Sequence, residues 1–589
     1  MVDNRNMILA VVLSVAILLG YELFFVKPEP APDRTAQTTT ETGEQVDSGQ
    51  IPNLPKTSES PAASGGAQVP SLGGEAQVPS DESRSTVLAR TQRIRIDTPR
   101  LHGSISLTGG RIDDLTLADY RETLDPDSAE IVLLSPQGAS NAYYAQFGWV
   151  AGNGAKVPAP NTEWTANSDI LTPNSPVTLS WDNGAGLVFQ RTYDIDENYL
   201  ISVTQRVVNS SSETVSLHAY GLISRRGTPE TTGFYILHEG LIGVFDSTLK
   251  EVDYDELKDT GSIEQSSPGG WLGITDKYWL MALVPNQKTT SASRFLHRME
   301  GLTDMYQVDY LGPRIEAPAG GSVEAENKLF AGAKETLLLD GYEETYGIDR
   351  FELAIDWGWF YFLTKPIFYA MLWINDRVFN LGVAILLLTV GIKIIFFPLA
   401  NKSYVSMSKM KKLQPKMTEM RERFGDDKMK LNQEMMALYK KEKVNPASGC
   451  LPIVVQIPVF FALYKVLFVT IEMRHAPFFG WIQDLSAPDP TSVFNLFGLI
   501  PFTPPDFLMI GVWPLIMGIS MFLQQKLNPQ PTDPIQAKIF MFLPIMFTFL
   551  LARFPAGLVV YWAWNNILSM AQQWVIMRRM GITGKEALK

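Results

Sequence analysis

The hydrophobic residues of this chain follow three patterns in turn. The first is an apolar run, Met7–Val26, which at ~1.5 Å per residue is long enough to cross about 30 Å of hydrocarbon. No small-residue cleavage site comes after it, because Tyr21–Phe25 is mostly bulky. We therefore expect residues 1–27 to be an uncleaved transmembrane anchor; a cleaved signal peptide is the alternative.

The second pattern alternates with a period of two. Residues 28–85 precede it and are rich in Pro, Gly, Ser and Thr, so we expect a flexible linker that cannot bury enough apolar surface to offset its ordering entropy. From about residue 86 to 350, short segments such as Arg93–Ile96 and Leu200–Thr204 alternate polar and apolar side chains between polar turns. This pattern predicts an all-β antiparallel sandwich domain.

The third pattern is a series of long apolar segments. Trp357–Phe362 is aromatic, and polar residues interrupt the apolar run after it, so 351–378 is expected to be an interfacial amphipathic helix, although its first half could belong to a spanning helix. Together with the anchor, five further segments predict six transmembrane α-helices, that is, the anchor plus a five-helix core. The five lie at about 380–399, 451–470, 508–527, 539–553 and 557–577.

These patterns divide the second half of the chain into four segments. They are a second transmembrane helix (379–400), a cytoplasmic helical hairpin (401–446), transmembrane helices three to six with their loops (447–577) and a tail (578–589).

Charge sets the predicted orientation. Residues 31–350 contain 24 Lys/Arg and 44 Asp/Glu, a balance of −20, whereas the whole chain is −12. The segment 401–445 holds twelve Lys/Arg, and 471–507 holds one, Arg474. By the positive-inside rule, both termini and the basic hairpin are cytoplasmic, and residues 28–350 lie on the other side of the membrane.

Chemical motifs of enzymes are absent. The chain has one cysteine, Cys450, no zinc-ligand spacing among its histidines, no phosphate-binding GxxxxGK[ST] and no GxSxG nucleophile motif. We expect neither catalysis nor a metal or cofactor. A solute transporter should show an internal repeat and polar sites at mid-membrane, and neither is found. A sugar-active sandwich is the other rival, but its scattered carboxylates are more typical of a solvated surface.

Lys393 is the leading candidate site residue. It lies within the second predicted span with Thr389 one turn away, and a charge in a spanning helix is costly enough to suggest function. Snorkelling to the nearby cytoplasmic end is the alternative. Polar residues of other spans gather towards the same side, which predicts a hydrated groove open to the cytoplasm; helix–helix hydrogen bonding is the rival explanation. They are Gln456, Ser520, Gln524, Gln525, Tyr561, Asn565, Ser569 and Gln573.

The basic hairpin is the second candidate. Residues 402–424 and 427–443 predict two helices, and methionines recur along them. Methionine surfaces adapt to varied apolar partners, but the hairpin could equally bury them against itself, and its basic residues could lie on anionic lipid headgroups. The candidate residues of the hairpin are Met407, Met410, Met417, Met420, Glu434 and Tyr439.

Several runs together resemble the YidC family of membrane protein insertases, in its Gram-negative form with a large periplasmic domain. The resemblance covers nearly the whole chain and rests on the runs Met420–Asp427, Gln433–Tyr439, Val444–Pro446, Gly449–Pro452, Gln456–Pro458, Trp481–Ser486 and Phe554–Leu558. It implies a non-enzymatic protein of the bacterial inner membrane, with a periplasmic β-supersandwich, that inserts and helps fold nascent hydrophobic segments.

The resemblance also implies roles for particular residues. The family's groove carries a positive residue, usually arginine, five before a proline, and here Lys393 precedes Pro398 by five. Lysine keeps the charge but loses the rigid five-donor fork, which favours a looser role in hydrating the groove and attracting acidic segments. Thr389, Gln456 and Tyr561 correspond to groove-lining positions. The positions along which the family's passengers slide correspond to Ile457, Pro458, Phe460 and Pro544.

The partners implied by the resemblance are nascent membrane proteins, the Sec translocon, membrane lipids and, weakly or transiently because the tail is short, the ribosome. No small-molecule substrate is implied. The loop 487–508 is longer than in comparable relatives, and its apolar stretch Phe494–Ile500 is too short to cross a bilayer, so we expect it to lie in a loop without an assigned role.

Overall fold

The structure is a computed structural model that describes residues 82–579, apart from 153, 234–235, 425–426, 443–450, 501, 503, 506–508 and 529–533. The predicted anchor (1–27), nearly all of the predicted linker and residues 580–589 lie outside the described part of the chain. The first described element is α2 (Arg84–Leu88), so regular structure begins slightly before the predicted boundary at residue 86.

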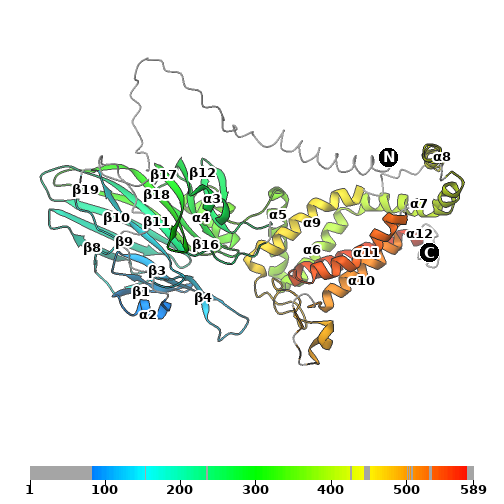
Figure 1. The fold of residues 1–589 in the computed structure, drawn as a ribbon, viewed down its shortest axis with the longest axis horizontal. Coiled ribbons are helices and arrows are strands. Elements are labelled where there is room, and N and C mark those ends of the chain that lie inside the picture. Colours follow the sequence, from blue (N-terminus) through cyan, green and yellow to red (C-terminus); the bar gives the residue numbers. More distant parts are fainter. Residues whose placement is uncertain are drawn as a thin grey trace, which may run out of the picture. The chain divides into compact units, whose positions relative to one another are not determined.

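The first domain is a sandwich of two large sheets (Figure 1), as the alternating pattern predicted. One sheet has the order β14-β17-β18-β11-β5-β3-β2-β1-β7, with β4 paired to β3. Its strands are β1 (Arg93–Asp97), β2 (Leu101–Ser106), β3 (Arg111–Arg121), β4 (Glu130–Leu134), β5 (Tyr143–Ala151), β7 (Ile170–Leu171), β11 (Val215–Arg226), β14 (Ser262–Pro268), β17 (Thr290–Glu300) and β18 (Thr303–Ala317).

The other sheet has the order β13-β12-β15-β16-β19-β10-β9-β8-β6. Its strands are β6 (Thr165–Ala166), β8 (Val177–Asp182), β9 (Leu187–Ile195), β10 (Leu200–Asn209), β12 (Gly240–Phe245), β13 (Thr248–Val252), β15 (Trp271–Thr275), β16 (Trp279–Val284) and β19 (Ser322–Ala333). Almost every pairing is antiparallel; β1 and β7 form a short parallel pair.

Period-two burial forms the core between the sheets. In β9, the residues Leu187, Phe189, Tyr193 and Ile195 are buried while their sequence neighbours are more exposed. Successive side chains of a strand point to opposite faces, so one face of the sheet enters the core. We call this sandwich, together with its helices α3 (Tyr254–Thr260) and α4 (Thr336–Tyr346), the β-domain.

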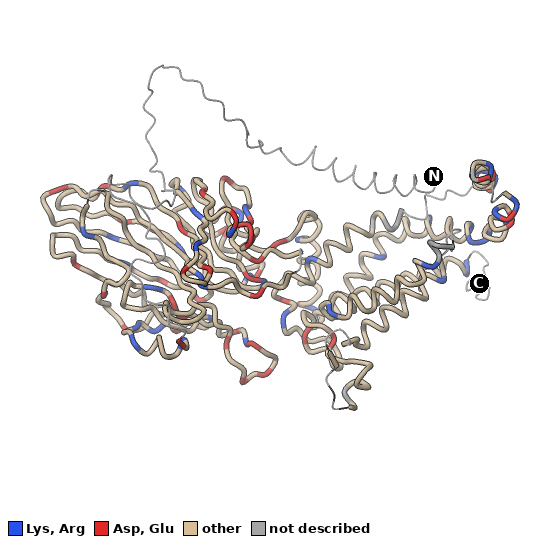
Figure 2. Tube along the Cα trace, in the orientation of Figure 1, with Lys and Arg blue, Asp and Glu red and all other residues tan. Residues whose placement is uncertain are grey.

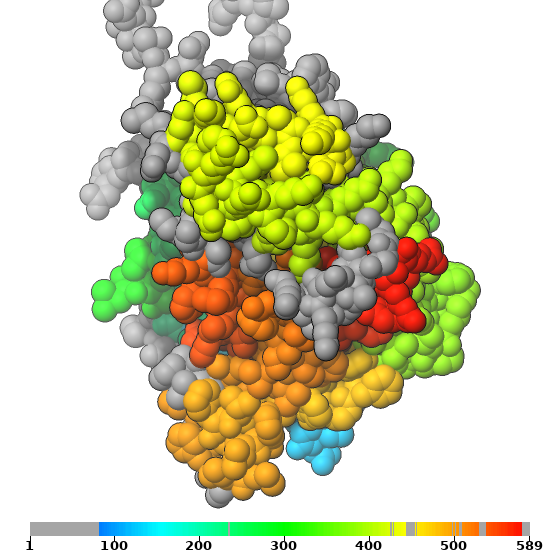
Figure 3. Space-filling view, turned by 90° about the vertical axis from the view of Figure 1, so that its right-hand side faces the viewer, coloured from blue at the N-terminus to red at the C-terminus, as the bar shows by residue number. Residues whose placement is uncertain are grey.

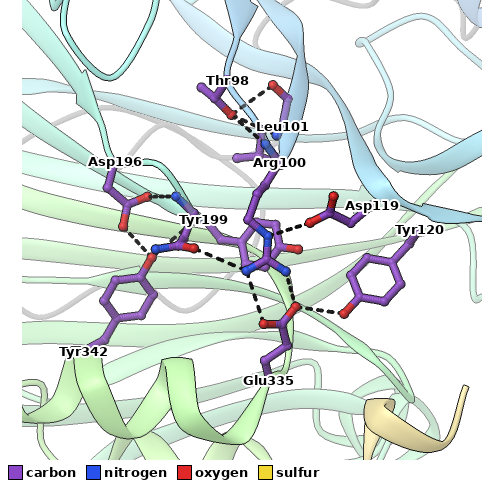
Figure 4. A network of polar contacts seen from close by, with 10 residues as sticks. Thr98, Arg100, Leu101, Asp119, Tyr120, Asp196, Tyr199, Glu335 and Tyr342 are labelled. Atoms are coloured by element: carbon purple, nitrogen blue, oxygen red, sulfur yellow. Dashed lines mark hydrogen bonds and ion pairs between the residues drawn. The ribbon is translucent and has the colours of Figure 1, made fainter. Parts of the chain in front are cut away.

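A polar network ties the sandwich to α4 (Figure 4). Arg100, in the turn between β1 and β2, donates to Asp119 at 2.7 Å and to Glu335, which stands at the N-cap position of α4. The hydroxyl of Tyr120 donates to the same Glu335 at 2.8 Å, and the guanidinium lies 4.3 Å from the ring centre of Tyr199. The partly buried guanidinium of Arg100 is therefore paired with carboxylates where the sandwich meets α4.

The second region is helical. Helix α12 packs against α10, α6, α9 and α7. Charged residues are frequent on the β-domain and on α7 and α8, and sparse along α6, α9, α10 and α11 (Figure 2). The elements are η1 (Phe351–Ala354), α5 (Tyr361–Val378), α6 (Leu381–Ile395), α7 (Phe397–Phe424), α8 (Lys428–Lys441), α9 (Leu451–Val469), η3 (Ile471–Met473), η4 (Val493–Gly498), α10 (Val512–Leu527), α11 (Pro534–Leu551) and α12 (Ala556–Arg579).

The helix predicted over 351–378 begins later than expected. Gly358 has a left-handed backbone (φ 72°), and α5 starts only at Tyr361. The predicted headgroup residue Trp357 is instead buried, with its ring 5.4 Å from that of Phe368. Lys365 of α5 donates to Glu352 at 2.6 Å, so an ion pair fixes the start of this helix against the preceding turn.

The helix in the second predicted span does not run straight to Leu399. It ends at Ile395, and the axis turns by 70° into α7. Proline has no N–H and disfavours helical geometry in the residue before it, but it fits the first turn of a new helix, where Pro398 stands. Within the described residues, no unbroken helix meets the length and hydropathy expected for a bilayer crossing; the bent pair α6–α7 does.

Candidate functional site

Lys393 lies in the last turn of α6 and reaches two other helices. Its Nζ donates to Ser569 Oγ of α12 at 2.8 Å and to Gln456 Oε1 of α9 at 3.4 Å. Both acceptors are neutral. Within the described chain, no carboxylate lies within ion-pair distance of this ammonium group.

Two further hydrogen bonds close the group. Gln456 Nε2 donates to Asn565 Oδ1 at 3.5 Å, and Ser569 Oγ donates to the backbone oxygen of Asn565 at 2.8 Å. We call Lys393, Gln456, Asn565 and Ser569 the Lys393 cluster. Three helices thus bring together four residues that the sequence analysis predicted to line one groove.

Tyr561 lies one helical turn before Asn565 on α12. It is fully buried, and its ring stacks on Phe460 of α9 with 6.4 Å between ring centres. The predicted groove residue Tyr561 and the predicted slide residue Phe460 are therefore direct neighbours.

Other predicted groove residues do not join the cluster. Thr389 is buried, and its hydroxyl donates to the oxygen of Ile385 on its own helix at 2.7 Å. Gln524 makes no hydrogen bond to the described residues of the cluster. Gln573 turns to α10 and donates to the oxygen of Leu527 at 3.1 Å.

The position of Gln573 results from helix geometry. Residues four apart on an α-helix advance by roughly 40° around the axis, so the direction turns by about 120° between Tyr561 and Gln573. The predicted polar stripe is therefore divided: its first part faces α6 and α9, and its last member faces α10.

Sequence reasoning missed Asn566. Its Nδ2 donates to Ser520 Oγ of α10 at 3.1 Å, and both residues are buried. Ser520 was expected to share a polar groove with Lys393. It instead makes a hydrogen bond between α10 and α12. A signal existed, because Asn566 comes directly after Asn565 and lies roughly 100° further around the same helix.

The predicted slide residues differ in exposure. Ile457 of α9 is exposed, Pro458 and Phe460 are half-buried, and Pro544 of α11 is buried with its oxygen accepting from Thr548 Oγ1 at 2.8 Å. The exposed apolar surface of α11 lies around Pro544 instead. It consists of Ile539, Phe540, Met541, Phe542, Ile545, Met546, Phe549 and Leu550.

The hairpin packs most of its candidate methionines against itself, which is the alternative that the sequence left open. Met417 is packed with Leu413 and Leu438, and Met410 and Met420 lie against this small core. The Tyr439 hydroxyl lies 3.8 Å from Met417 Sδ. Met407 and Glu434 are half-buried, whereas the exposed methionines are Met429 and Met436.

Two other lysines of the helical region have acidic partners. Lys465 of α9 lies 2.7 Å from Asp356, and Lys365 of α5 contacts Asp340 and Glu352. Among the described residues, no group of three or more His, Cys, Asp or Glu side chains is arranged to hold a metal ion.

A β-sandwich followed by apolar helices that enclose a charged polar cluster is the arrangement expected of a membrane protein with a large domain outside the bilayer. Two family profiles match the chain in succession: the YidC periplasmic domain at residues 93–370 and the 60Kd inner membrane protein at residues 373–583. The chain belongs to the YidC family of membrane protein insertases, which are not enzymes. The resemblance found in the sequence is confirmed.

Relatives match along almost the whole length. The membrane protein insertase YidC of Methylobacterium nodulans is 53% identical over 590 residues, covering 98% of this chain and 96% of the relative. That of Rhizobium meliloti is 50% identical over 587 residues, covering 99% and 97%. A solved active YidC insertase with its first transmembrane domain resolved is 18% identical, covers 82% of this chain and 92% of that chain, and has a TM-score of 0.34.

Proposed function

We propose that this insertase works through a hydrated groove centred on Lys393 and open to the cytoplasm. The observation that carries the proposal is the bonding of Lys393 Nζ to the neutral side chains of Ser569 and Gln456. A charge among helices that has only neutral partners can still attract an opposite charge, and it keeps water nearby. The polar flank of a passenger segment enters here.

The apolar part of the passenger takes a different surface. Ile457 on α9 and the exposed apolar side chains of α11 offer a path towards lipid. Burial of apolar area supplies the driving force, about 25 cal/mol per Å². The groove lowers the barrier because it shortens the distance that the polar flank crosses in hydrocarbon.

The proposed topology has six spans with both termini in the cytoplasm and residues 28–350 in the periplasm. The twelve Lys/Arg of 401–445 and the single Arg474 of 471–507 support this orientation. The hairpin then faces the cytoplasm, where Met429 and Met436 are exposed to an arriving passenger. The Sec translocon, the ribosome and anionic lipids are further proposed partners.

Replacement of Lys393 tests the groove. Lys393→Ala and Lys393→Arg are compared for insertion of a small single-span substrate, with Lys409→Ala as the control because Lys409 is an exposed lysine of α7. We expect Lys393→Ala to lose most insertion while Lys393→Arg and the control retain it. Full activity of Lys393→Ala would remove the residue from the mechanism.

A further inference from the structure

The segment connecting α9 to α10 exposes a group of large apolar side chains that the proposed mechanism does not use. Leu499 is 83% exposed, and five neighbours are between 45% and 53% exposed. Single exposed apolar residues are ordinary, but a contiguous patch marks a contact surface. We call this patch the apolar spur: Phe494, Leu496, Phe497, Leu499, Ile500 and Phe502. The segment, golden-orange in Figure 3, projects from the bundle.

The spur is an ordered turn. The N–H of Phe497 donates to the oxygen of Ser492 at 2.8 Å, and that of Ile500 to the oxygen of Asn495 at 3.1 Å. Asn495 Nδ2 donates in turn to the oxygen of Phe502 at 3.3 Å. Because these polar groups are hydrogen-bonded within the spur, they would keep their partners if the spur moved from water into lipid.

A buried carboxylate fixes the base of the spur to α10. Asp489 Oδ1 accepts from Trp481 Nε1 at 3.1 Å and from the N–H of Thr491 at 3.0 Å, while Oδ2 accepts from the N–H of Trp513 at 2.9 Å. Gly511 gives the carboxylate room, since a Cβ there would lie 2.3 Å from Asp489 Cγ. The spur is therefore held in one place relative to the first turn of α10.

Two bulky residues of the spur have an unusual backbone conformation. Leu496 and Phe497 have φ of 49° and 59°, a left-handed conformation that bulky residues rarely adopt. Their side chains nevertheless remain 53% and 51% exposed. Strain of this kind clusters at sites of function, and packing within the described chain does not account for it.

The composition points to lipid as the occupant. No Lys, Arg, Asp or Glu occurs from Ser492 to Pro505. Protein interfaces surround an apolar centre with a polar rim and are enriched in Arg, and this segment supplies no charged residue. Phe479 and Trp481 on the same connection are also exposed, and aromatic residues favour the headgroup level.

Chain connectivity places the spur at one end of the helices. The connection between α9 and α10 bonds to the α5–α6 connection through Asn380 Nδ2 and the oxygen of Phe478 at 3.2 Å. It also bonds to the start of α12, where the N–H of Ala556 donates to Ala487 at 2.7 Å. In the proposed orientation this is the periplasmic end.

We infer that the apolar spur inserts into the outer leaflet of the bilayer beside α10, with its side chains at the boundary between headgroups and acyl chains. It anchors the outer end of the bundle at a fixed depth. Only the choice of leaflet rests on the proposed orientation; contact with lipid does not.

Lipid contact is measured by quenching in the full-length chain. A Cys450→Ala background carries Leu499→Cys labelled with a bimane fluorophore, in vesicles of phosphatidylethanolamine and phosphatidylglycerol with brominated acyl chains. The matched control is Leu302→Cys, because Leu302 is a 99% exposed leucine in the turn between β17 and β18. Phe502→Cys provides a second probe should Leu499→Cys fail to fold.

We expect the probes at 499 and 502 to lose most of their fluorescence to brominated lipid, more with bromine near the ester than near the chain end, and little to aqueous iodide. The probe at 302 should show the reverse. Quenching of 499 and 502 by iodide alone would overturn the inference, because the spur would lie in water. Protection from both quenchers would also overturn it, because protein would then cover the spur.

Discussion

The β-domain fixes its buried arginines with carboxylates or backbone oxygens, whereas the Lys393 cluster of the helical bundle offers its cation neutral side chains. In the β-domain, Arg294 and Asp309 form a buried pair at 2.9 Å, and Arg225 lies 2.8 Å from Asp276. No carboxylate among the described residues pairs with Arg191, but its guanidinium is fixed by backbone oxygens, including that of Gly110 at 2.9 Å. In the bundle, Lys393 has two neutral side chains as its partners.

This difference distinguishes cations that only stabilise the fold from a cation that could bind a further group. A buried cation with a carboxylate partner has little attraction left for a third group, and removal of its partner leaves a costly unpaired charge. In the proposed function, the charge of Lys393 remains available to a group that arrives from outside. Its removal should therefore affect function more than stability, and the reverse should hold for the paired charges.

The largest effect is expected for the pair in the β-domain. Asp309→Ala leaves the buried guanidinium of Arg294 without its carboxylate, so the free energy of unfolding should fall by about 3–5 kcal/mol. Asp255→Ala is the control, because Asp255 and Lys258 form an exposed pair expected to contribute about 0–1 kcal/mol. Chemical denaturation of the full-length chain in detergent measures both, and equal losses would show that the buried pair is not a structural charge of this kind.

Glu472 should make stability depend on pH. It lies in η3, outside the predicted spans, and burial raises the pKa of its carboxyl from 4.5 to about 7, opposed by backbone hydrogen bonds including one from Thr336. Between these values the folded chain binds more protons than the unfolded chain, so stability falls as the pH rises from about 4.5 to about 7, by up to ~3 kcal/mol.

Glu472→Gln removes this dependence. The difference in melting temperature between variant and parent should be small near pH 4.5 and should grow in favour of the variant up to about pH 7. A constant difference over that range would show that folding does not raise the pKa of Glu472.

Lys393→Met tests whether the charge of Lys393 stabilises the helical bundle. Methionine fills similar volume and removes an enclosed charge that has no carboxylate partner, so the free energy of unfolding should rise slightly, by roughly 1 kcal/mol. Denaturation in detergent measures it, with Lys409→Met as the exposed control. A loss as large as that of Asp309→Ala would make Lys393 a structural residue.

The smallest effect is expected for Asn566→Ala. It removes the hydrogen bond to Ser520 between α12 and α10, and such bonds between membrane helices contribute about 0.6 kcal/mol. Insertion should be retained, because Asn566 lies outside the Lys393 cluster. The same denaturation and insertion assays apply; an insertion defect as large as that of Lys393→Ala would extend the cluster to this residue.

Periodicity predicted much of this arrangement. Alternation identified the β-domain, and the depth of polar residues along apolar segments identified Lys393, Gln456, Asn565 and Ser569, which the structure brings together. Both signals depend only on helix or strand geometry and on the cost of polar groups in lipid, so they can be read from one sequence.

Local breaks and partner choice were harder to predict. Because Phe396–Leu399 is apolar, hydropathy alone extends the second predicted span beyond the bend at Phe396. In the sequence, only Pro398 indicates that bend. The methionines of the hairpin are equally compatible with a client surface and a small core, because amphipathicity does not identify what covers an apolar face. Gln573 was misplaced because residues four apart advance by roughly 40° around the helix axis, and this rotation adds up over the three steps from Tyr561.

A charge reversal at position 393 shows whether the Lys393 charge is available to a passenger. Lys393→Glu and the parent are compared for insertion of two single-span substrates that differ only in whether the translocated flank is acidic or basic. If the charge is available, the parent should favour the acidic flank and Lys393→Glu should favour the basic one. The same preference in both proteins would contradict the proposed role of Lys393.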